Sequence, residues 1–340
     1  MITVFDEAQR AHDPQFFLSS GAAQPCPEKP ARVDALLGAV RALGGPVVQA
    51  PDAGIDPILR VHPARYLTFL QTIHSRWTRI PGASAEVIPN IHPANRTDGY
   101  PLSAVGQAGF HQTDTSCPIS AETWGAACAS AQTAIHGADL VHQGERAVYA
   151  LCRPPGHHAF AELAGGFCYL NNSAIAAQRL TDAGRRVAIL DVDLHHGNGT
   201  QAIFYDRPDV YFASIHGDPR TEYPFYLGHA DETGTGAGLG ANLNLPLPRG
   251  TDYATWAQAL ETALAGIAKF GADALVVSLG MDTFEGDPIS GFKLTTQDYL
   301  RLGERLARAG LPTVFVFEGG YAVDAVGVNA VNVLQGFTSP

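Results

Sequence analysis

Short apolar runs alternate with amphipathic stretches through the second half of the chain, and this alternation restricts the fold more than any other feature. The apolar runs have the length and aliphatic content of strands buried on both faces of a parallel sheet. They cover residues 147–151, 187–190, 210–213, 274–278 and 313–317. Helical stretches lie between most of them, at residues 172–183, 253–269 and 296–309. The sequence therefore predicts a doubly wound α/β sheet, whose ligand site lies beyond the carboxyl ends of the strands.

One large α/β domain can fill a chain of 340 residues, of which 46% are apolar and 16% charged, so a second domain is possible but not required. The least regular segment spans residues 79–120 and contains five prolines but little periodicity. No Ser/Gly-rich or charge-biased composition marks a domain boundary there, so this segment is expected to be a long functional or interface loop rather than a linker. We therefore expect a single domain over residues 1–340.

Charge and hydropathy exclude several classes of partner. The formal net charge of −11 disfavours a nucleic-acid-binding protein, whose phosphate contacts need a basic face, and it mildly favours cationic ligands. The N-terminus lacks the features of a secretory signal, and no apolar run approaches the roughly 20 residues that span a bilayer. The five cysteines form no Cys-x-x-Cys pair, which argues against a disulfide framework or a thiolate zinc site. We expect a cytoplasmic protein without nucleic-acid or membrane partners.

The strongest chemical signal is an Asp-x-Asp-x-His-His motif at the end of the apolar run 187–190. If that strand stays extended, Asp191, Asp193 and His195 share one face, because side chains alternate with a period of two. Two carboxylates in such a place repel each other and resist burial unless a cation holds them. A divalent metal resolves this conflict. The alternative is a capping aspartate beside solvated histidines at a strand-to-loop turn.

A third acidic residue, Asp282, follows the apolar run 274–278. Taken alone, such a residue more often caps a helix or a turn. A catalytic zinc commonly takes three protein ligands and leaves a position for water. The residues Asp193, His195 and Asp282 would suffice for such a site.

Two further motifs follow predicted strands. The segment Arg153-Pro-Pro-Gly-His157-His158 places adjacent imidazoles in a stiff turn, and histidine titrates near neutrality, so the pair can take a proton from water and deliver one to a leaving amine. In Glu318-Gly-Gly-Tyr321, two glycines let the chain turn tightly enough to bring a phenol towards the same centre. Paired exposed histidines and packed loop tyrosines are both common, so only the combination of these motifs is specific.

These motifs, in this order, resemble the histone deacetylase superfamily, and most closely its bacterial acetylpolyamine amidohydrolases. The resemblance includes the segments 60–66 and 166–172 and runs through most of the chain. It implies the arginase-deacetylase fold, in which helices flank an eight-stranded parallel sheet and long loops surround the active site. It also implies a catalytic zinc, with Fe²⁺ able to occupy the same ligands, and a homodimer in which residues 79–120 form the pocket rim and the interface.

The resemblance also assigns roles to the other motif residues. His158 would be the general base and acid, supported by Asn198, and His157 would be its electrostatic partner, paired with Asp191. Tyr321 would hydrogen-bond the scissile carbonyl and then its oxyanion. The three metal ligands carried over are the same three that the spacing suggests.

Members of the superfamily also bind a monovalent cation, K⁺ or Na⁺, beside the zinc site. The resemblance places this cation on Asp191, Asp193 and Ser214, with the backbone of His195 and Ile215. The walls of the substrate tunnel would be formed by three residues, which are Phe167, Tyr223 and Ile289.

Other activities and other substrates compete with a small-amine deacetylase. An arginase-type ureohydrolase would need a further carboxylate beside Asp282, where this chain has Thr283 and Phe284, and a non-catalytic sensor should lack a ligand or Tyr321. In the polyamine branch, the loop before the histidine pair should carry acidic side chains for distal ammonium groups, but residues 104–116 offer only Asp114. We therefore expect a zinc-dependent deacetylase of small acetylated amines such as acetylpolyamines. The alternatives are a protein acetyl-lysine deacetylase or a hydrolase of another small amide.

Overall fold

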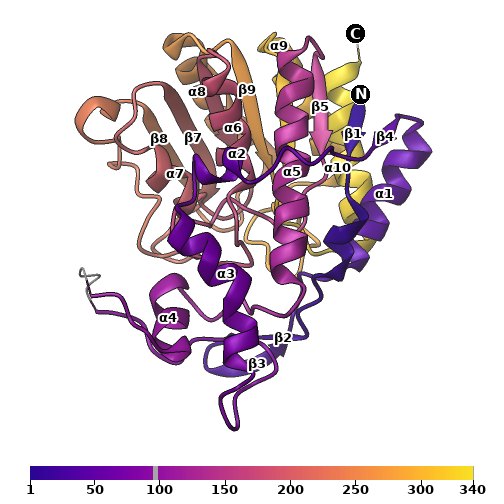
Figure 1. The fold of residues 1–340 in the computed structure, drawn as a ribbon. Helices are drawn as coiled ribbons and strands as arrows, with labels where there is room; N and C mark the ends of the chain where they lie inside the picture. Colours follow the sequence, from indigo (N-terminus) through magenta and orange to yellow (C-terminus); the bar gives the residue numbers. More distant parts are fainter. Residues whose placement is uncertain (95–98, 340) are drawn as a thin grey trace.

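Eight strands form one sheet at the centre of the molecule, and every pair of neighbours is parallel (Figure 1). The computed structural model describes residues 1–94 and 99–339. In sheet order the strands are β4 (Val47–Val48), β1 (Ile2–Val4), β5 (Ala147–Ala150), β10 (Thr313–Phe317), β9 (Ala274–Leu279), β6 (Val187–Asp191), β7 (Val210–Gly217) and β8 (Asn242–Leu247). The prediction of an eight-stranded parallel sheet is therefore confirmed.

Helices cover both faces of the sheet, because alternate side chains of each strand point to opposite faces. Val276 of β9 belongs to the core on one face and Val277 to the core on the other. One core is closed by α1 (Ala31–Leu43), α8 (Tyr253–Phe270), α9 (Thr296–Arg308) and α10 (Val323–Thr338). The other contains residues of α2 (Asp56–Leu59), α3 (Ala64–Trp77), α4 (Ala104–His111), α5 (Thr123–His142), α6 (Asn172–Asp182) and α7 (Asn198–Phe204).

The segment 79–120 is less irregular than its sequence suggests. Helix α4 occupies residues 104–111, so the prediction of a continuous loop is wrong there. The side chain of Ser103 caps this helix by accepting a hydrogen bond from the backbone N–H of Gly106 at 3.1 Å. Within the helix, a Cβ at Gly109 would lie 1.8 Å from the carbonyl oxygen of Ile91, so the close packing of this segment requires glycine. Residues 95–98 of the predicted loop lie outside the described residues.

Within residues 1–94 and 99–339, the remaining elements are a short hairpin and two 3₁₀ turns. The hairpin strands β2 (Phe16–Ser19) and β3 (Ala22–Pro25) are antiparallel and lie on the same side of the molecule as α4 (Figure 1). The hairpin is tied to the segment before α5, because the backbone N–H of Leu18 donates to the carbonyl oxygen of Thr115 at 3.3 Å. The 3₁₀ turns are η1 (Glu7–Ala11) and η2 (Gly236–Gly238). Among the described residues, no helix is long and apolar enough to cross a membrane.

The order of the central strands explains why four distant motifs meet. Strands β5, β10, β9 and β6 are consecutive neighbours in the sheet. The histidine pair follows β5, the Glu-Gly-Gly-Tyr turn follows β10, Asp282 follows β9, and the Asp-x-Asp-x-His motif begins at the last residue of β6. Because parallel strands present their carboxyl ends at one edge, all four motifs lie at the same edge of the sheet.

Candidate active site

Asp193, His195 and Asp282 form a cluster whose ligand atoms all lie within 4.8 Å of one another. The Nδ1 atom of His195 lies 3.3 Å from Asp193 Oδ1 and 3.0 Å from Asp282 Oδ2. Both aspartate side chains are fully buried, whereas that of His195 is 14% exposed towards the pocket. The structure thus brings together the three residues that the spacing suggested as metal ligands.

The backbone holds each carboxylate in place. Asp193 Oδ2 accepts a hydrogen bond from the N–H of Gly319 at 2.9 Å, and Asp282 Oδ1 accepts one from the N–H of Leu194 at 2.9 Å. A Cβ at Gly280 would lie 2.0 Å from Asp193 Oδ2. The glycine after β9 therefore makes room for the carboxylate that follows β6.

The electrostatics of this cluster fit a divalent cation. Burial, reinforced by the negative charge of Asp193, raises the pKa of Asp282 to about 7. Two buried carboxylates this close are costly without a compensating positive charge. An imidazole nitrogen and two carboxylates form a donor set that suits zinc. The residues present therefore fit the metal that the sequence suggested.

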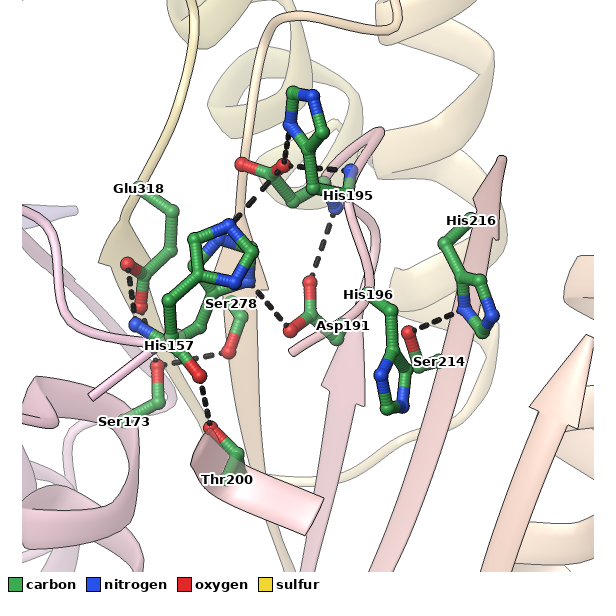
Figure 2. A network of polar contacts seen from close by, with 12 residues as sticks. His157, Ser173, Asp191, His195, His196, Thr200, Ser214, His216, Ser278 and Glu318 are labelled. Carbon is green, nitrogen blue, oxygen red and sulfur yellow. Dashed lines mark hydrogen bonds and ion pairs between the residues drawn. The ribbon is translucent and has the colours of Figure 1, made fainter. Parts of the chain in front are cut away.

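The histidine pair lies directly beside this cluster, and its two rings have different partners. His157 Nδ1 lies 3.0 Å from Asp191 Oδ2, whereas His158 Nδ1 lies 2.7 Å from Asn198 Oδ1 (Figure 2 shows the first contact). Burial opposes protonation of His157, but the charges of Asp191 and Asp193 outweigh it and raise its pKa to about 10. Burial and the neighbouring charge of His157 lower the pKa of His158. The environment therefore favours a charged His157 beside a neutral His158.

Glu318 belongs to a second group of potential ligands, with His157 and Cys168, but its carboxylate is already occupied. Glu318 Oε2 accepts hydrogen bonds from the backbone N–H groups of Gly156 at 2.6 Å and of His157 at 3.1 Å, and Oε1 accepts one from the hydroxyl of Ser173 at 2.9 Å. Figure 2 shows Glu318 beside His157 and Ser173. These bonds fix the turn that carries the histidine pair. We therefore assign Glu318 a structural role.

Tyr321 reaches the pocket from the turn after β10, and two residues that the sequence analysis did not select hold that turn. Asp287 Oδ2 accepts hydrogen bonds from the backbone N–H of Tyr321 at 2.6 Å and of Ala322 at 2.8 Å. The guanidinium of Arg32 lies 4.8 Å from the centre of the Tyr321 ring and donates to the carbonyl oxygen of Gly320 at 2.7 Å. The roles of Asp287 and Arg32 could not be predicted from the sequence, because each contact joins residues far apart in the chain.

Asp191 and Ser214 are paired residues on the neighbouring strands β6 and β7. Asp191 Oδ1 accepts a hydrogen bond from the N–H of Asp193 at 3.1 Å, and the hydroxyl of Ser214 lies 2.8 Å from His216 Nδ1 (Figure 2). The monovalent cation expected at these residues stays a prediction.

A cavity of about 610 Å³ leads from this centre to the surface. One aromatic wall runs from Phe17 through Phe167 to Tyr321, with ring centres 5.5 and 5.7 Å apart. The other passes through Tyr223, whose ring centre lies 4.9 Å from that of His158 and 6.3 Å from that of Phe225. The three expected tunnel residues, including Ile289, all line this cavity.

Comparison with known proteins agrees with this arrangement. A histone deacetylase domain matches residues 26–337. Acetylpolyamine amidohydrolase 1 of Pseudomonas aeruginosa is 52% identical over 99% of both chains, and the acetylpolyamine amidohydrolase of Mycoplana ramosa is 48% identical over 99% of both. The crystal structure of an acetylpolyamine aminohydrolase from Burkholderia pseudomallei superposes with a TM-score of 0.96 at 45% identity, covering 100% of this chain and 99% of that one.

The chain therefore belongs to the histone deacetylase family and has the arginase-deacetylase fold. Within that family it is an amidohydrolase, a deacetylase that is similar along its whole length to the acetylpolyamine amidohydrolases. Deacetylases of this family are metal-dependent, and the metal is generally zinc.

Proposed function

We propose that this protein is a zinc-dependent deacetylase that hydrolyses N-acetyl amides of small amines, acetylpolyamines among them. The arrangement of Asp193, His195 and Asp282 at the base of an aromatic pocket, beside His158 and Tyr321, is the observation that carries the proposal. The names of the relatives from Pseudomonas aeruginosa and Mycoplana ramosa support the substrate class.

The cluster Asp193, His195 and Asp282 would hold the ion, which when bound polarises the acetyl carbonyl and makes a nearby water more acidic. His158 would take the proton of the attacking water. Its Nδ1 faces the amide oxygen of Asn198, which only accepts hydrogen bonds, so Nδ1 carries the hydrogen and Nε2 is free to act as a base. The same nitrogen would then give the proton to the leaving amine.

The remaining groups would stabilise charge during the reaction. Tyr321 would donate its O–H to the carbonyl oxygen as negative charge develops there. His157, held by Asp191, would keep a positive charge beside His158 and discourage early protonation of the base. Water adds to the carbonyl, the C–N bond breaks, and acetate and a free amine leave without a covalent intermediate on the protein.

Three further features belong to this proposal. Fe²⁺ would fit the same three ligands, and Asp191 and Ser214 would contribute to a K⁺ or Na⁺ site. The active form would be a cytoplasmic homodimer whose interface includes the segment 79–120. The exposure of two apolar residues there supports an interface, since Ile91 is 60% exposed and Leu102 is 90% exposed.

A substrate panel tests the proposed activity. Zinc-loaded protein would be assayed with acetylputrescine, acetylspermine, an acetyl-lysine peptide and acetanilide under one set of salt conditions. We expect the acetylated amines to give the highest kcat/KM, with only a modest preference for the longer polyamines. A peptide preferred by more than roughly tenfold would place the protein with the protein deacetylases instead.

A further inference from the structure

Asp114 is the acidic residue that the sequence analysis noted before the histidine pair, and its contacts suggest a role other than charge. Its Oδ2 atom accepts a hydrogen bond from the hydroxyl of Tyr223 at 2.7 Å and another from the backbone N–H of Gly166 at 3.0 Å. Its Oδ1 atom accepts a third from the N–H of Ser116 at 2.7 Å, which fixes the carboxylate itself. One oxygen atom thus joins two parts of the pocket that are 57 residues apart in the chain, between positions 166 and 223.

Those two parts belong to the two aromatic walls. Tyr223 is itself one wall, and Gly166 is followed immediately by Phe167, which belongs to the other. Both side chains line the same cavity. The carboxylate therefore ties the walls to each other on one side of the passage to the catalytic centre.

The backbone at Phe167 requires contacts that hold its conformation. Phe167 has a φ of 68°, in the left-handed region that bulky side chains rarely adopt, and Gly166 before it has a φ of 51°. The two residues form the tip of a tight turn in which Gly165 and Cys168 exchange backbone hydrogen bonds of 3.1 and 2.8 Å. Strained backbone of this kind persists only where the surroundings hold it. The hydrogen bond from the backbone N–H of Gly166 to Asp114 holds the backbone of the tip from outside the turn, while Phe17 and Tyr321 pack against the Phe167 ring.

The hydrogen bonds that Asp114 accepts from Tyr223 and Gly166 lie close to the catalytic groups. A Cβ at Gly166 would lie 2.4 Å from Cδ2 of His158 and 3.0 Å from the hydroxyl of Tyr223. The turn therefore packs directly against His158 and Tyr223, so a shift of Gly166 would displace residues that line the cavity.

We propose that Asp114 is a positioning residue that ties Phe167 to Tyr223 and thereby sets the width of the pocket neck, which selects unbranched alkyl amides over branched or cyclic ones. This inference rests on the proposed function, since it takes the cavity to be the substrate site. It assigns the selectivity to shape: the carboxylate acts through the two aromatic rings and not by pairing with a cationic substrate.

Two neutral amides with equal numbers of carbon atoms test this selectivity. N-hexylacetamide is linear and N-cyclohexylacetamide is branched next to the nitrogen. We expect the wild-type protein to prefer the linear amide, and we expect Asp114→Ala to reduce the ratio of the two kcat/KM values by roughly tenfold, mainly through KM. Tyr223→Phe, which removes a single oxygen atom, should reduce the ratio by roughly threefold. Glu261→Gln on α8, outside this cavity, should leave the ratio unchanged.

A third substrate separates shape from charge. N-acetyl-1,5-diaminopentane resembles the linear amide but carries an ammonium group. If Asp114→Asn lowers kcat/KM for this cation much more than for N-hexylacetamide, and the linear-to-cyclic ratio does not change, Asp114 binds charge and the positioning role is wrong. An unchanged ratio in both Asp114→Ala and Tyr223→Phe would equally overturn it.

Binding of the product amines keeps the test independent of turnover. Calorimetry would compare n-hexylamine and cyclohexylamine on the wild-type protein, Asp114→Ala and Tyr223→Phe. If the wild-type protein hydrolyses none of the amides, the proposed function fails, but the loss of preference for the linear amine still tests the role of Asp114. If Asp114→Ala does not fold, Tyr223→Phe carries the test.

Discussion

The base of the pocket and its rim are built differently. At the base, Asp193 and Asp282 are fully buried, and each accepts a hydrogen bond from the backbone. At the rim, Phe225 is 50% exposed and Tyr226 is 87% exposed. Groups that perform chemistry must hold one geometry, whereas a rim that meets different substrates can tolerate changes of side chain. Substitutions at the base should therefore abolish catalysis, while those at the rim should only adjust it.

The largest losses of kcat are expected from two variants, Tyr321→Phe, which removes the proposed oxyanion donor, and His158→Ala, which removes the proposed base. Tyr321→Phe is the more conservative of the two. The change should lower kcat by roughly 10²- to 10³-fold while zinc content stays that of the wild-type protein. His158→Ala should lower kcat at least as far. Steady-state kinetics with metal analysis on the same samples would check both variants, and wild-type activity in Tyr321→Phe would assign the electrophilic role elsewhere.

A large effect on stability is expected at Glu28, a buried carboxylate that pairs with both Arg32 and Arg153. Glu28 Oε1 accepts hydrogen bonds from Arg32 at 2.8 Å and Arg153 at 2.7 Å, and all three side chains are fully buried. Glu28→Gln would leave two buried arginines without their counter-charge and should lower the free energy of unfolding by about 3 kcal/mol. Chemical denaturation would measure this. The exposed pair formed by Glu261 and Arg305 gives the control, because Glu261→Gln should cost less than about 1 kcal/mol.

Because Arg32 and Arg153 pair with Glu28, the free energy of unfolding should depend on pH. Burial alone would raise the pKa of Glu28, but the charges of Arg153 and Arg32 outweigh burial and hold the pKa below its ordinary value. A carboxyl whose pKa is lower in the folded state stabilises that state at neutral pH, and this stabilisation is lost as the pH falls through the folded pKa. Glu28→Gln should therefore remove part of the acid sensitivity of unfolding below about pH 4. Equal acid sensitivity of the two proteins would contradict this account.

A moderate effect is expected at Asp287, which holds the backbone of Tyr321 without touching the metal cluster. Asp287→Asn keeps the shape but weakens two charge-assisted hydrogen bonds, so kcat should fall by roughly tenfold with zinc retained. A variant with lost zinc would show that Asp287 supports the ligands as well as Tyr321.

The smallest effect is expected at the rim. Tyr226→Ala removes an exposed ring that lines the cavity, so KM should rise by no more than roughly threefold and kcat should not change. A fall in kcat comparable with that of Asp287→Asn would mean that base and rim are not separable.

The sequence predicted the base of the pocket better than the rim. The motifs at Asp193, Asp282 and His158 each follow an apolar strand, and the carboxyl ends of parallel strands share one edge, so their meeting follows from the strand pattern alone. Residue type and spacing also suggested metal ligation by Asp193 and Asp282 and proton transfer by the histidine pair, whereas the choice of His158 as the base came from the family resemblance. The strand β7 was predicted too short, because its last residues include Ser214 and His216, which are buried by pairing with β8 and not by their own hydropathy.

The rim could not be predicted in the same way. Helix α4 contains Gly106 and Gly109, which are weak helix formers, and its stability comes from packing against distant backbone. The contacts of Asp114 with Tyr223 and of Asp287 with Tyr321 join loops far apart in the chain. Such contacts cannot be predicted from a periodic sequence pattern, because they depend on loop conformations and not on strand or helix repeats.

The central claim is that Asp193, His195 and Asp282 bind a divalent ion on which hydrolysis depends. The most direct measurement is the zinc content and the acetylputrescine kcat/KM of Asp282→Ala beside Asp287→Asn, which changes a neighbouring carboxylate outside the cluster. The account predicts folded protein with little zinc and little activity for Asp282→Ala, and full zinc with reduced but measurable activity for Asp287→Asn. Full zinc occupancy in Asp282→Ala would contradict it.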